Sequence, residues 1–386
     1  MAQLDFTLAA GPVAVSHRTL AGLARPIVYH YDPDFIATFR RVEEKVAQIF
    51  RTSNDIVLMQ GEAIVGLEGA ARSVVQQGTP VLNLVQGVFG KGMGYWLSSF
   101  GAVLHEIEVP YDDAVTPELV RAYLDEHPEI EVLTLVASET PSGTVCDVEA
   151  IGGLCRDRGV LTLVDTVSGV LGMPWETDAW GLDIVVAGAQ KCLGGPPGVA
   201  MLAVSPKAWD RIESNPSAPR DSYLSLLDWK TKWHGEGRFP YTPSVSDVQG
   251  LEAALDQALE EGIENVVRRH QLAADVTRAG VTAMGLSLWP VREEIAAACV
   301  TSVRLPDGVD GLLLRNLVRE RYGVMLSHGQ GAGNLIRIGH MGPTASGLHQ
   351  IVGLSALGRS LADLGQPVTI GAGLEAALAV LSSQRS

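Results

Sequence analysis

The feature that most constrains the fold is a series of short apolar segments that alternate with helix-like segments. Seven segments of this kind occur in the first 204 residues, at 56–59, 80–85, 103–109, 131–136, 160–164, 184–186 and 199–204. Several are apolar throughout, as are strands that a parallel sheet buries on both faces. The intervening segments 117–126 and 148–157 fit crossover helices. The sequence therefore predicts an α/β domain with a doubly wound, mostly parallel sheet.

The remainder of the chain has a different pattern. A long helical pattern runs from about residue 248 to 278, followed by strand-like segments at 299–304 and 335–338 and helix-like segments at 311–322 and 346–364. At 386 residues the chain is too long for one hydrophobic core. We predict three parts: an N-terminal arm at 1–17, a large α/β domain at 18–250, and a smaller α+β domain at 251–386.

Composition excludes several classes of protein. A formal net charge of −15 disfavours nucleic acid as a partner. No segment approaches the ~20 apolar residues that a membrane span needs, and the N-terminus lacks the basic start of a signal peptide. We expect a cytoplasmic protein with no membrane partner. The four cysteines have no CxxC spacing and the nine histidines form no HxH or HExxH pattern, so we predict no metal site.

Two strand ends carry the most informative side chains. Asp165 ends one apolar strand, and Lys191 follows a second, 191 − 165 = 26 residues later. Pyridoxal-dependent enzymes hold one ring between such groups: the carboxylate pairs with the protonated ring nitrogen, and the lysine forms a Schiff base. Alone, each residue also fits a plain role, as a helix cap or a solvated loop lysine. Their joint occurrence at strand ends, where α/β sheets bind ligands, favours pyridoxal chemistry.

Nine segments in order along the chain support a more specific interpretation. They are 8–13 (LAAGPV), 29–33 (YHYDP), 61–68 (GEAIVGLE), 87–96 (GVFGKGMGYW), 139–144 (ETPSGT), 215–220 (NPSAPR), 239–245 (FPYTPSV), 278–287 (RAGVTAMGLS) and 337–343 (RIGHMGP). Together they resemble the fold-type I, class V aminotransferases of the alanine-glyoxylate and serine-pyruvate group. The resemblance implies the large and small domains of that fold.

The resemblance assigns roles to individual residues. Lys191 becomes the Schiff base and proton shuttle, and Asp165 the partner of the ring nitrogen. Phe89 would stack on the pyridine face, and Thr140 would contact its polar edge. Arg337 would bind a substrate carboxylate through its planar fork. The plain alternatives are a core aromatic for Phe89, a turn residue for Thr140 and a surface ion pair for Arg337.

Further positions follow from the same resemblance. Tyr29 and His328 are assigned to the substrate, and His328 stands where we expect a second arginine, so the keto acid preference stays open. The residues assigned to the cofactor site are Gly61, Gln190, Val167 and Thr242, the last from a neighbouring subunit. The resemblance thus implies a homodimer or homotetramer in which the segment around 239–243 serves the partner's site.

Glu62 is the most discriminating of these positions. A helix is expected to begin near Gly61, and a helix N-terminus at this place binds a phosphate in the phosphate-using relatives. A carboxylate there repels a phosphate by roughly 1 kcal/mol in water and by several kcal/mol when partly buried. Simple helix capping by Glu62 is the alternative. The pocket is better suited to a ligand without phosphate.

The implied reaction converts pyridoxamine and pyruvate to pyridoxal and L-alanine, so vitamin B6 is consumed as a substrate and no permanent cofactor is needed. An alternative from the same fold is an alanine-glyoxylate or serine-pyruvate aminotransferase that keeps pyridoxal 5′-phosphate. A vitamin B6 carrier without turnover is a further alternative, but a carrier has no need for a lysine that traps its ligand. The segment 90–94 is no dinucleotide motif, because Tyr95 replaces its final glycine.

Overall fold

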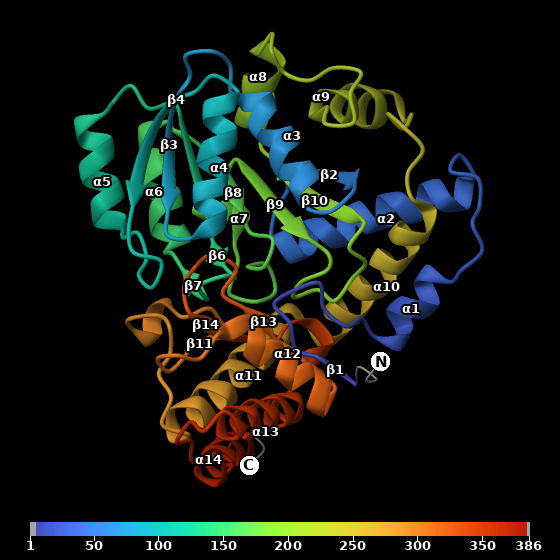
Figure 1. Cartoon of the computed structure of the whole chain (residues 1–386). Helices are drawn as coiled ribbons and strands as arrows, with labels where there is room; N and C mark the ends of the chain where they lie inside the picture. Colours follow the sequence, from blue (N-terminus) through green and yellow to red (C-terminus); the bar gives the residue numbers. More distant parts are fainter. Residues whose placement is uncertain (1–4, 384–386) are drawn as a thin grey trace.

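The computed structural model describes residues 5–383, and a seven-stranded sheet forms its centre (Figure 1). The strand order is β2-β10-β9-β8-β5-β3-β4, and every neighbouring pair is parallel except those that include β10. The strands are β2 (Asp55–Gln60), β3 (Pro80–Val85), β4 (Val103–Glu108), β5 (Val132–Val136), β8 (Leu161–Asp165), β9 (Ile184–Gly188) and β10 (Val199–Val204). These are the seven predicted segments, so the mostly parallel α/β fold is confirmed.

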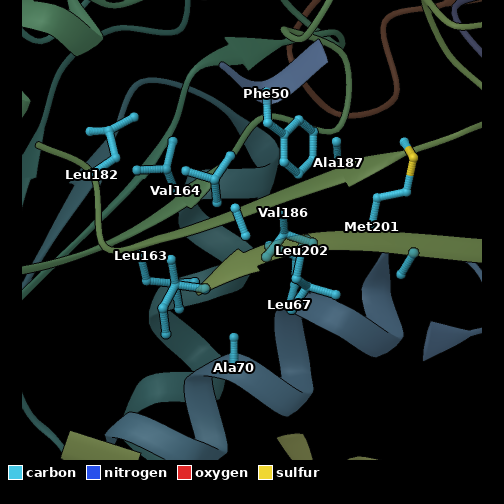
Figure 2. Packing of buried hydrophobic residues seen from close by; sticks show 14 of the residues in the cluster. Phe50, Leu67, Ala70, Leu163, Val164, Leu182, Val186, Ala187, Met201 and Leu202 are labelled. Atoms are coloured by element: carbon cyan, nitrogen blue, oxygen red, sulfur yellow. The ribbon is translucent and has the colours of Figure 1, made fainter. Parts of the chain in front are cut away.

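Helices cover both faces of the sheet, which explains why its strands are apolar throughout (Figure 1). They are α2 (Pro33–Phe50), α3 (Ile64–Val74), α4 (Val88–Ser99), α5 (Pro117–Glu126), α6 (Val148–Arg158), α7 (Thr177–Trp180) and α8 (Pro206–Ser214). Figure 2 shows α3 packed on the strands that carry Val186 and Leu202. At Gly66 of α3, a Cβ would lie 3.0 Å from Leu202 and 3.1 Å from Val186, so a larger residue would displace these side chains by a few tenths of an ångström.

A second unit surrounds a three-stranded antiparallel sheet of order β11-β14-β13 (Val300–Arg304, Leu335–Gly339 and Ser327–His328). Its helices are α11 (Ile263–Ala283), α12 (Gly311–Tyr322), α13 (Gly347–Asp363) and α14 (Ile370–Ser383). A separate hydrophobic cluster, which includes Val276, Ile336 and Leu354, holds the unit together. The smaller α+β unit is therefore present as predicted, with α14 as an unpredicted addition.

The predicted long helix at 248–278 is wrong in one respect. Two helices, α10 (Val245–Glu261) and α11, replace it, with Gly262 between them at φ +89°. Only glycine adopts this conformation readily, and it ends the helix. The proposed domain boundary at residue 250 falls within α10, and the division at 18–250 and 251–386 stays a proposal. Residues 1–4 of the arm and 384–386 lie outside the described residues.

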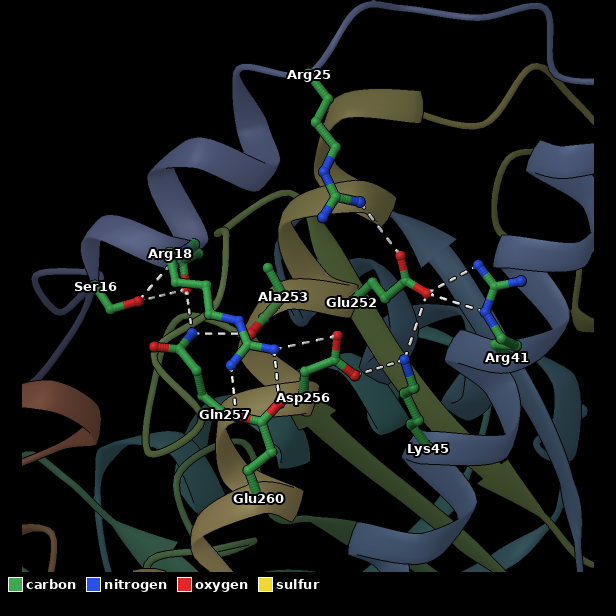
Figure 3. Close-up of polar contacts among 11 residues, drawn as sticks. Ser16, Arg18, Arg25, Arg41, Lys45, Glu252, Ala253, Asp256, Gln257 and Glu260 are labelled. Atoms are coloured by element: carbon green, nitrogen blue, oxygen red, sulfur yellow. Dashed lines mark hydrogen bonds and ion pairs between the residues drawn. The ribbon is translucent and has the colours of Figure 1, made fainter.

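The N-terminal arm connects the two units. Its strand β1 (Phe6–Thr7) pairs in parallel with β12 (Val324–Met325) of the second unit. The helix α1 (His17–Leu23) then lies against α10, where its Arg18 pairs with Asp256 at 3.7 Å and with Glu260 (Figure 3). Residues between these two contacts pass beside the β9 strand end.

The acidic face of α10 also binds α2. Lys45 of α2 lies 2.6 Å from Asp256 and 3.4 Å from Glu252 (Figure 3). One lysine reaches both carboxylates because they are four residues apart and so share one face of α10. The arm, α2 and α10 are thus held in one arrangement. In the described part of the chain, no helix has both the length and the apolar character to cross a membrane.

Candidate active site

A cavity opens at the carboxyl ends of the parallel strands, where the sequence predicts the site. It brings together six of the predicted residues: Glu62, Phe89, Thr140, Asp165, Val167 and Lys191. Ala63, Ile64, Leu67, Ser138 and Ser168 complete its lining. The residues come from five separate stretches of the chain, so the fold alone assembles them.

Asp165 is the last residue of β8 and is buried. Its carboxylate accepts a hydrogen bond from the main-chain N–H of Val167 at 2.9 Å. Within residues 5–383, no basic side chain forms an ion pair with it. Burial raises the pKa of Asp165 to about 6, against the lowering effects of the Val167 bond and of Lys191. A cationic ring nitrogen is a partner that this carboxylate lacks, so the site fits a protonated pyridine.

Lys191 lies three residues past the end of β9, and its Nζ donates a hydrogen bond to the carbonyl of Ala10 at 2.8 Å. The neighbouring Gly11 has φ +104°, and a Cβ there would lie 2.4 Å from Nζ. The arm therefore covers the lysine only because residue 11 is glycine. Burial lowers the pKa of Lys191 from its ordinary value, which favours the neutral, nucleophilic amine.

Arg337 lies on β14 and is buried beside the cavity. Its Nε donates to the carbonyl of His328 at 2.9 Å, Nη1 to the carbonyl of Thr140 at 2.9 Å, and Nη2 to Oε1 of Gln330 at 3.2 Å. A guanidinium has five N–H donors, so one on each terminal nitrogen stays available for a carboxylate. Burial lowers the pKa of Arg337 to about 10, so the guanidinium is still cationic at neutral pH.

His328 binds Arg337 through its main chain, and its assignment to the substrate stays a prediction. The imidazole of His328 lies 3.4 Å from Arg315, and only its main-chain oxygen contacts Arg337. Gln330 is the side chain that holds the guanidinium, and sequence reasoning missed it. Its position between Gly329 and Gly331 was the available signal, and its φ of +50° is unusual for a residue other than glycine.

Glu62 binds the start of α3, which is the capping role weighed for it, and its role against phosphate stays a prediction. Its Oε2 accepts a hydrogen bond from the N–H of Ile64, the first residue of α3, at 2.9 Å, and its Oε1 accepts one from the amide of Gln190. The helix begins at Ile64, slightly later than expected. Gly61 donates its N–H to the carbonyl of Gly198 at 2.8 Å, which fixes the loop. The α3 N-terminus at the cavity is thus already occupied by a carboxylate.

Phe89 and Thr140 are linked through Glu139, which precedes Thr140 in the chain and binds the main chain of Phe89. Phe89 is in the first turn of α4, and its N–H donates to the Glu139 carboxylate at 3.2 Å. Thr140 follows Glu139 directly and is buried in the cavity wall. Sequence reasoning assigned no role to Glu139, although a carboxylate beside an apolar strand end was visible in the motif ETPSGT.

Tyr29 and Thr242 are exposed and lie outside the cavity lining of this single chain. The ring of Tyr29 contacts only those of His30 and Tyr31 among the described aromatic pairs. Their assignment to substrate and cofactor stays a prediction, and for Thr242 it depends on a neighbouring subunit.

One group of possible metal ligands lies elsewhere in the described residues. Single ligand atoms of His105, His127 and Glu129 lie within 4.8 Å of one another. They are on the β4 edge of the sheet and after α5, outside the cavity lining, and their polar atoms already contact Tyr123 and each other. The expectation that the reaction uses no metal stays a prediction.

Comparisons with known proteins agree with this geometry. The Aminotransferase class-V family model matches residues 15–341. The pyridoxamine-pyruvate transaminase of Mesorhizobium japonicum is 47% identical over 379 residues, which cover 98% of this chain and 96% of that protein. The crystal structure of pyridoxamine-pyruvate aminotransferase from Mesorhizobium loti has a TM-score of 0.96 at 46% identity and covers 99% and 98% of the two chains.

A more distant solved structure has the same fold. The alanine-glyoxylate aminotransferase of Nostoc sp. gives a TM-score of 0.89 at 28% identity, with 94% of this chain and 96% of that chain covered. The family match includes Asp165, Lys191 and Arg337. The resemblance drawn from the sequence is therefore confirmed at the level of the fold and the enzyme class, and the chain belongs to the class V aminotransferase family, with the type I fold.

Proposed function

We propose that this aminotransferase converts pyridoxamine and pyruvate to pyridoxal and L-alanine and holds no permanent cofactor. The observation that carries the proposal is the carboxylate of Glu62 on the N-terminus of α3, at the mouth of the cavity. A dianionic phosphate is disfavoured beside this carboxylate, whereas pyridoxamine has no phosphate. The 47% identity to a protein named for this reaction supports the same substrates.

The residues divide the work between binding and proton transfer. Asp165 binds the protonated ring nitrogen and keeps the ring electron-withdrawing, and Phe89 packs on the ring face. The two free N–H groups of Arg337 bind the carboxylate of pyruvate. Lys191 moves the proton between the 4′ carbon of the vitamin and the α-carbon of the amino acid. Its amine, whose pKa is lowered by burial, then captures the pyridoxal formed.

A second copy of the chain completes the site in this proposal. Ile27 and Tyr29 are 78% and 68% exposed, which is unusual for large apolar side chains that lie close together. Tyr29 and Thr242 are not among the residues that line the cavity of their own chain, and a partner's cavity would give both a role. We expect a homodimer or a dimer of dimers.

The alternative is an enzyme that retains pyridoxal 5′-phosphate, as class V aminotransferases do. One observation favours it: Oε1 of Gln190 is buried beside Glu62 and has no hydrogen-bond partner in the described structure. An unpartnered amide oxygen at this place can accept a hydrogen bond from a further donor of a cofactor site. The Gln190 amide already donates to the Glu62 carboxylate, and this carboxylate stays unfavourable for the phosphate.

The test is alanine formation from pyridoxamine and pyruvate by enzyme purified without added phosphate cofactor. We expect turnover that continues beyond one equivalent of vitamin, with pyridoxal released in equal amount to alanine. A protein that carries stoichiometric pyridoxal 5′-phosphate and ignores free pyridoxamine contradicts the proposal and supports the alternative. Bound vitamin without any turnover supports a carrier.

Replacement of Glu62 tests the exclusion of phosphate. The Glu62→Ser variant keeps a helix-capping oxygen but removes the charge, so we expect binding of pyridoxal 5′-phosphate to improve about tenfold or more, from a repulsion of roughly 1 to 4 kcal/mol. Glu68→Ser on the same helix is the matched control, because Glu68 pairs with Arg72 away from the cavity. Unchanged or weaker phosphate affinity in Glu62→Ser counts against the repulsion.

Replacement of Arg337 tests the keto acid site. We expect Arg337→Ala to raise the KM for pyruvate about a hundredfold, because a hydrogen bond to a charged group contributes up to about 3 kcal/mol. The KM for pyridoxamine is expected to change little. Arg359→Ala, at an exposed ion pair of α13, is the control. A pyruvate dependence equal to that of the wild type removes Arg337 from the site.

A further inference from the structure

Glu139 is the least explained charged group beside the cavity. It ends the short strand β6 (Ser138–Glu139) and is fully buried. It does not line the cavity itself, but the next residue, Thr140, does. A buried carboxylate is costly unless other groups compensate its charge, so its contacts indicate what it does.

The carboxylate of Glu139 binds one helix turn through main-chain donors. Oε1 accepts the N–H of Gly90 at 2.7 Å, and Oε2 accepts the N–H of Phe89 at 3.2 Å. No lysine, arginine or histidine in residues 5–383 forms an ion pair with it. Burial raises the pKa of Glu139 to about 7, and the two N–H groups oppose this rise. The first turn of α4, which carries Phe89, is therefore attached to this one side chain.

Glycines make room for the attachment. A Cβ on Gly87 would lie 2.4 Å from the carboxyl carbon of Glu139, and a Cβ on Gly90 would lie 3.4 Å from its Oε1. Gly87 has an extended backbone, so the need for glycine comes from the space that the carboxylate occupies. Gly87, two residues before Phe89, thus leaves the space that the Glu139 carboxylate fills, whereas a Cβ on Gly90 would be in ordinary contact with it.

The main chain around Glu139 reaches the two other anchors of the site. Two residues earlier, the N–H of Ala137 donates to the carbonyl of Asp165 at 2.8 Å. One residue later, the carbonyl of Thr140 accepts a hydrogen bond from Arg337 at 2.9 Å. The carbonyl of Glu139 is itself fixed by the N–H of Gly143 at 2.7 Å. One short segment therefore touches the residues that bind the ring nitrogen, the ring face and the carboxylate.

We propose that Glu139 is a positioning residue that fixes the Phe89 ring relative to Asp165 and Arg337, so that the vitamin ring is held on its face and at its nitrogen in one geometry. The inference rests on the proposed function, since it assumes that Phe89 packs on a pyridine ring. Glu139 acts through Phe89 and does not touch the substrate. A purely structural helix cap would instead stabilise α4 without a specific effect on the ring.

The test is a double-mutant cycle between Glu139 and Phe89. Glu139→Gln keeps the shape but turns one acceptor into an NH₂ group that faces an N–H donor. We expect about a tenfold rise in the KM for pyridoxamine, with the KM for pyruvate within about twofold. Phe89→Leu should cause a similar rise, and the double variant should equal Phe89→Leu alone. Glu108→Gln is the control, because Glu108 is exposed and forms an ion pair with Lys91 of α4.

The readouts separate positioning from stability. Fully additive effects on the KM for pyridoxamine, or equal losses for both substrates, overturn the proposal and leave Glu139 as a cap. Gly87→Ala provides a second variant if Glu139→Gln does not fold, because it displaces the carboxylate without removing its charge, and it should show the same dependence on Phe89.

Binding measurements distinguish failure of this inference from failure of the proposed function. The visible circular dichroism of pyridoxal, and separately of pyridoxal 5′-phosphate, reports the ring's fixed orientation in each variant. If the wild-type protein binds only the phosphate form, the proposed function fails, but the same cycle measured with that ligand still decides the role of Glu139. A dichroic signal that Glu139→Gln leaves unchanged contradicts the positioning role.

Discussion

Lys191→Ala is expected to abolish turnover, with a fall of at least about ten-thousandfold in kcat. General acid–base catalysis contributes up to about 10⁴-fold, and the covalent capture of pyridoxal is lost as well. No other lysine lines the cavity in the described structure, so no neighbour replaces the amine. Pyridoxamine binding should survive, since Asp165 and Phe89 remain.

The measurement is borohydride reduction of protein loaded with pyridoxal, followed by mass spectrometry. The wild type should gain one pyridoxyl group on Lys191, and the variant should gain none. Lys232→Ala is the control, because Lys232 forms ion pairs with Asp221 and Asp228 far along the chain from the cavity residues. A reduced adduct on a different lysine in the active wild type would show that Lys191 is wrongly assigned.

Asp165→Asn is expected to lower kcat/KM for pyridoxamine by about a hundredfold or more. The variant keeps the volume and the Val167 contact but loses the charge that holds the ring nitrogen protonated. A hydrogen bond between charged groups contributes up to about 3 kcal/mol, and weaker electron withdrawal by the ring adds to the loss. Asp221→Asn, at an exposed position, serves as the control.

The pH dependence gives an independent signature of Asp165. Its pKa is raised to about 6, so the carboxylate that binds the ring is present above this pH and protonated below it. We expect kcat/KM for pyridoxamine to fall about tenfold per pH unit below pH 6. Glu139, with a pKa of about 7, is a second group that titrates nearby. If the Asp165→Asn variant shows the same fall in kcat/KM below pH 6, another residue causes that fall.

Much of the large domain was predictable because its pattern is local. Each of the seven apolar segments is a strand, since burial on both faces leaves a continuous apolar stretch in the sequence. The segment 248–278 shows the limit of this reasoning. Its helical composition continues across Gly262, but the chain takes a positive φ at that glycine and begins a second helix there.

The site was predictable in its residue types but less so in its contacts. Asp165 and Lys191 are recognisable because each follows an apolar strand, and parallel strands end at one edge of a sheet. The support for Arg337 was missed, because it comes from Gln330 on an irregular loop that has no periodicity. The proposed role of Tyr29 and Thr242 in a partner's cavity needs a second copy of the chain, and the pattern of a single sequence does not show where that copy binds.

The sequence by itself determined the strands, their ends and the chemistry of the groups placed there, because these depend on neighbours along the chain. Only the tertiary structure decided which groups meet. Ala10 holds Lys191 across 181 positions, Phe89 binds Glu139 across 50, and Arg337 binds Thr140 across 197. Such contacts are created when separate segments pack together, and the residues that make them leave no local pattern that would identify their partners.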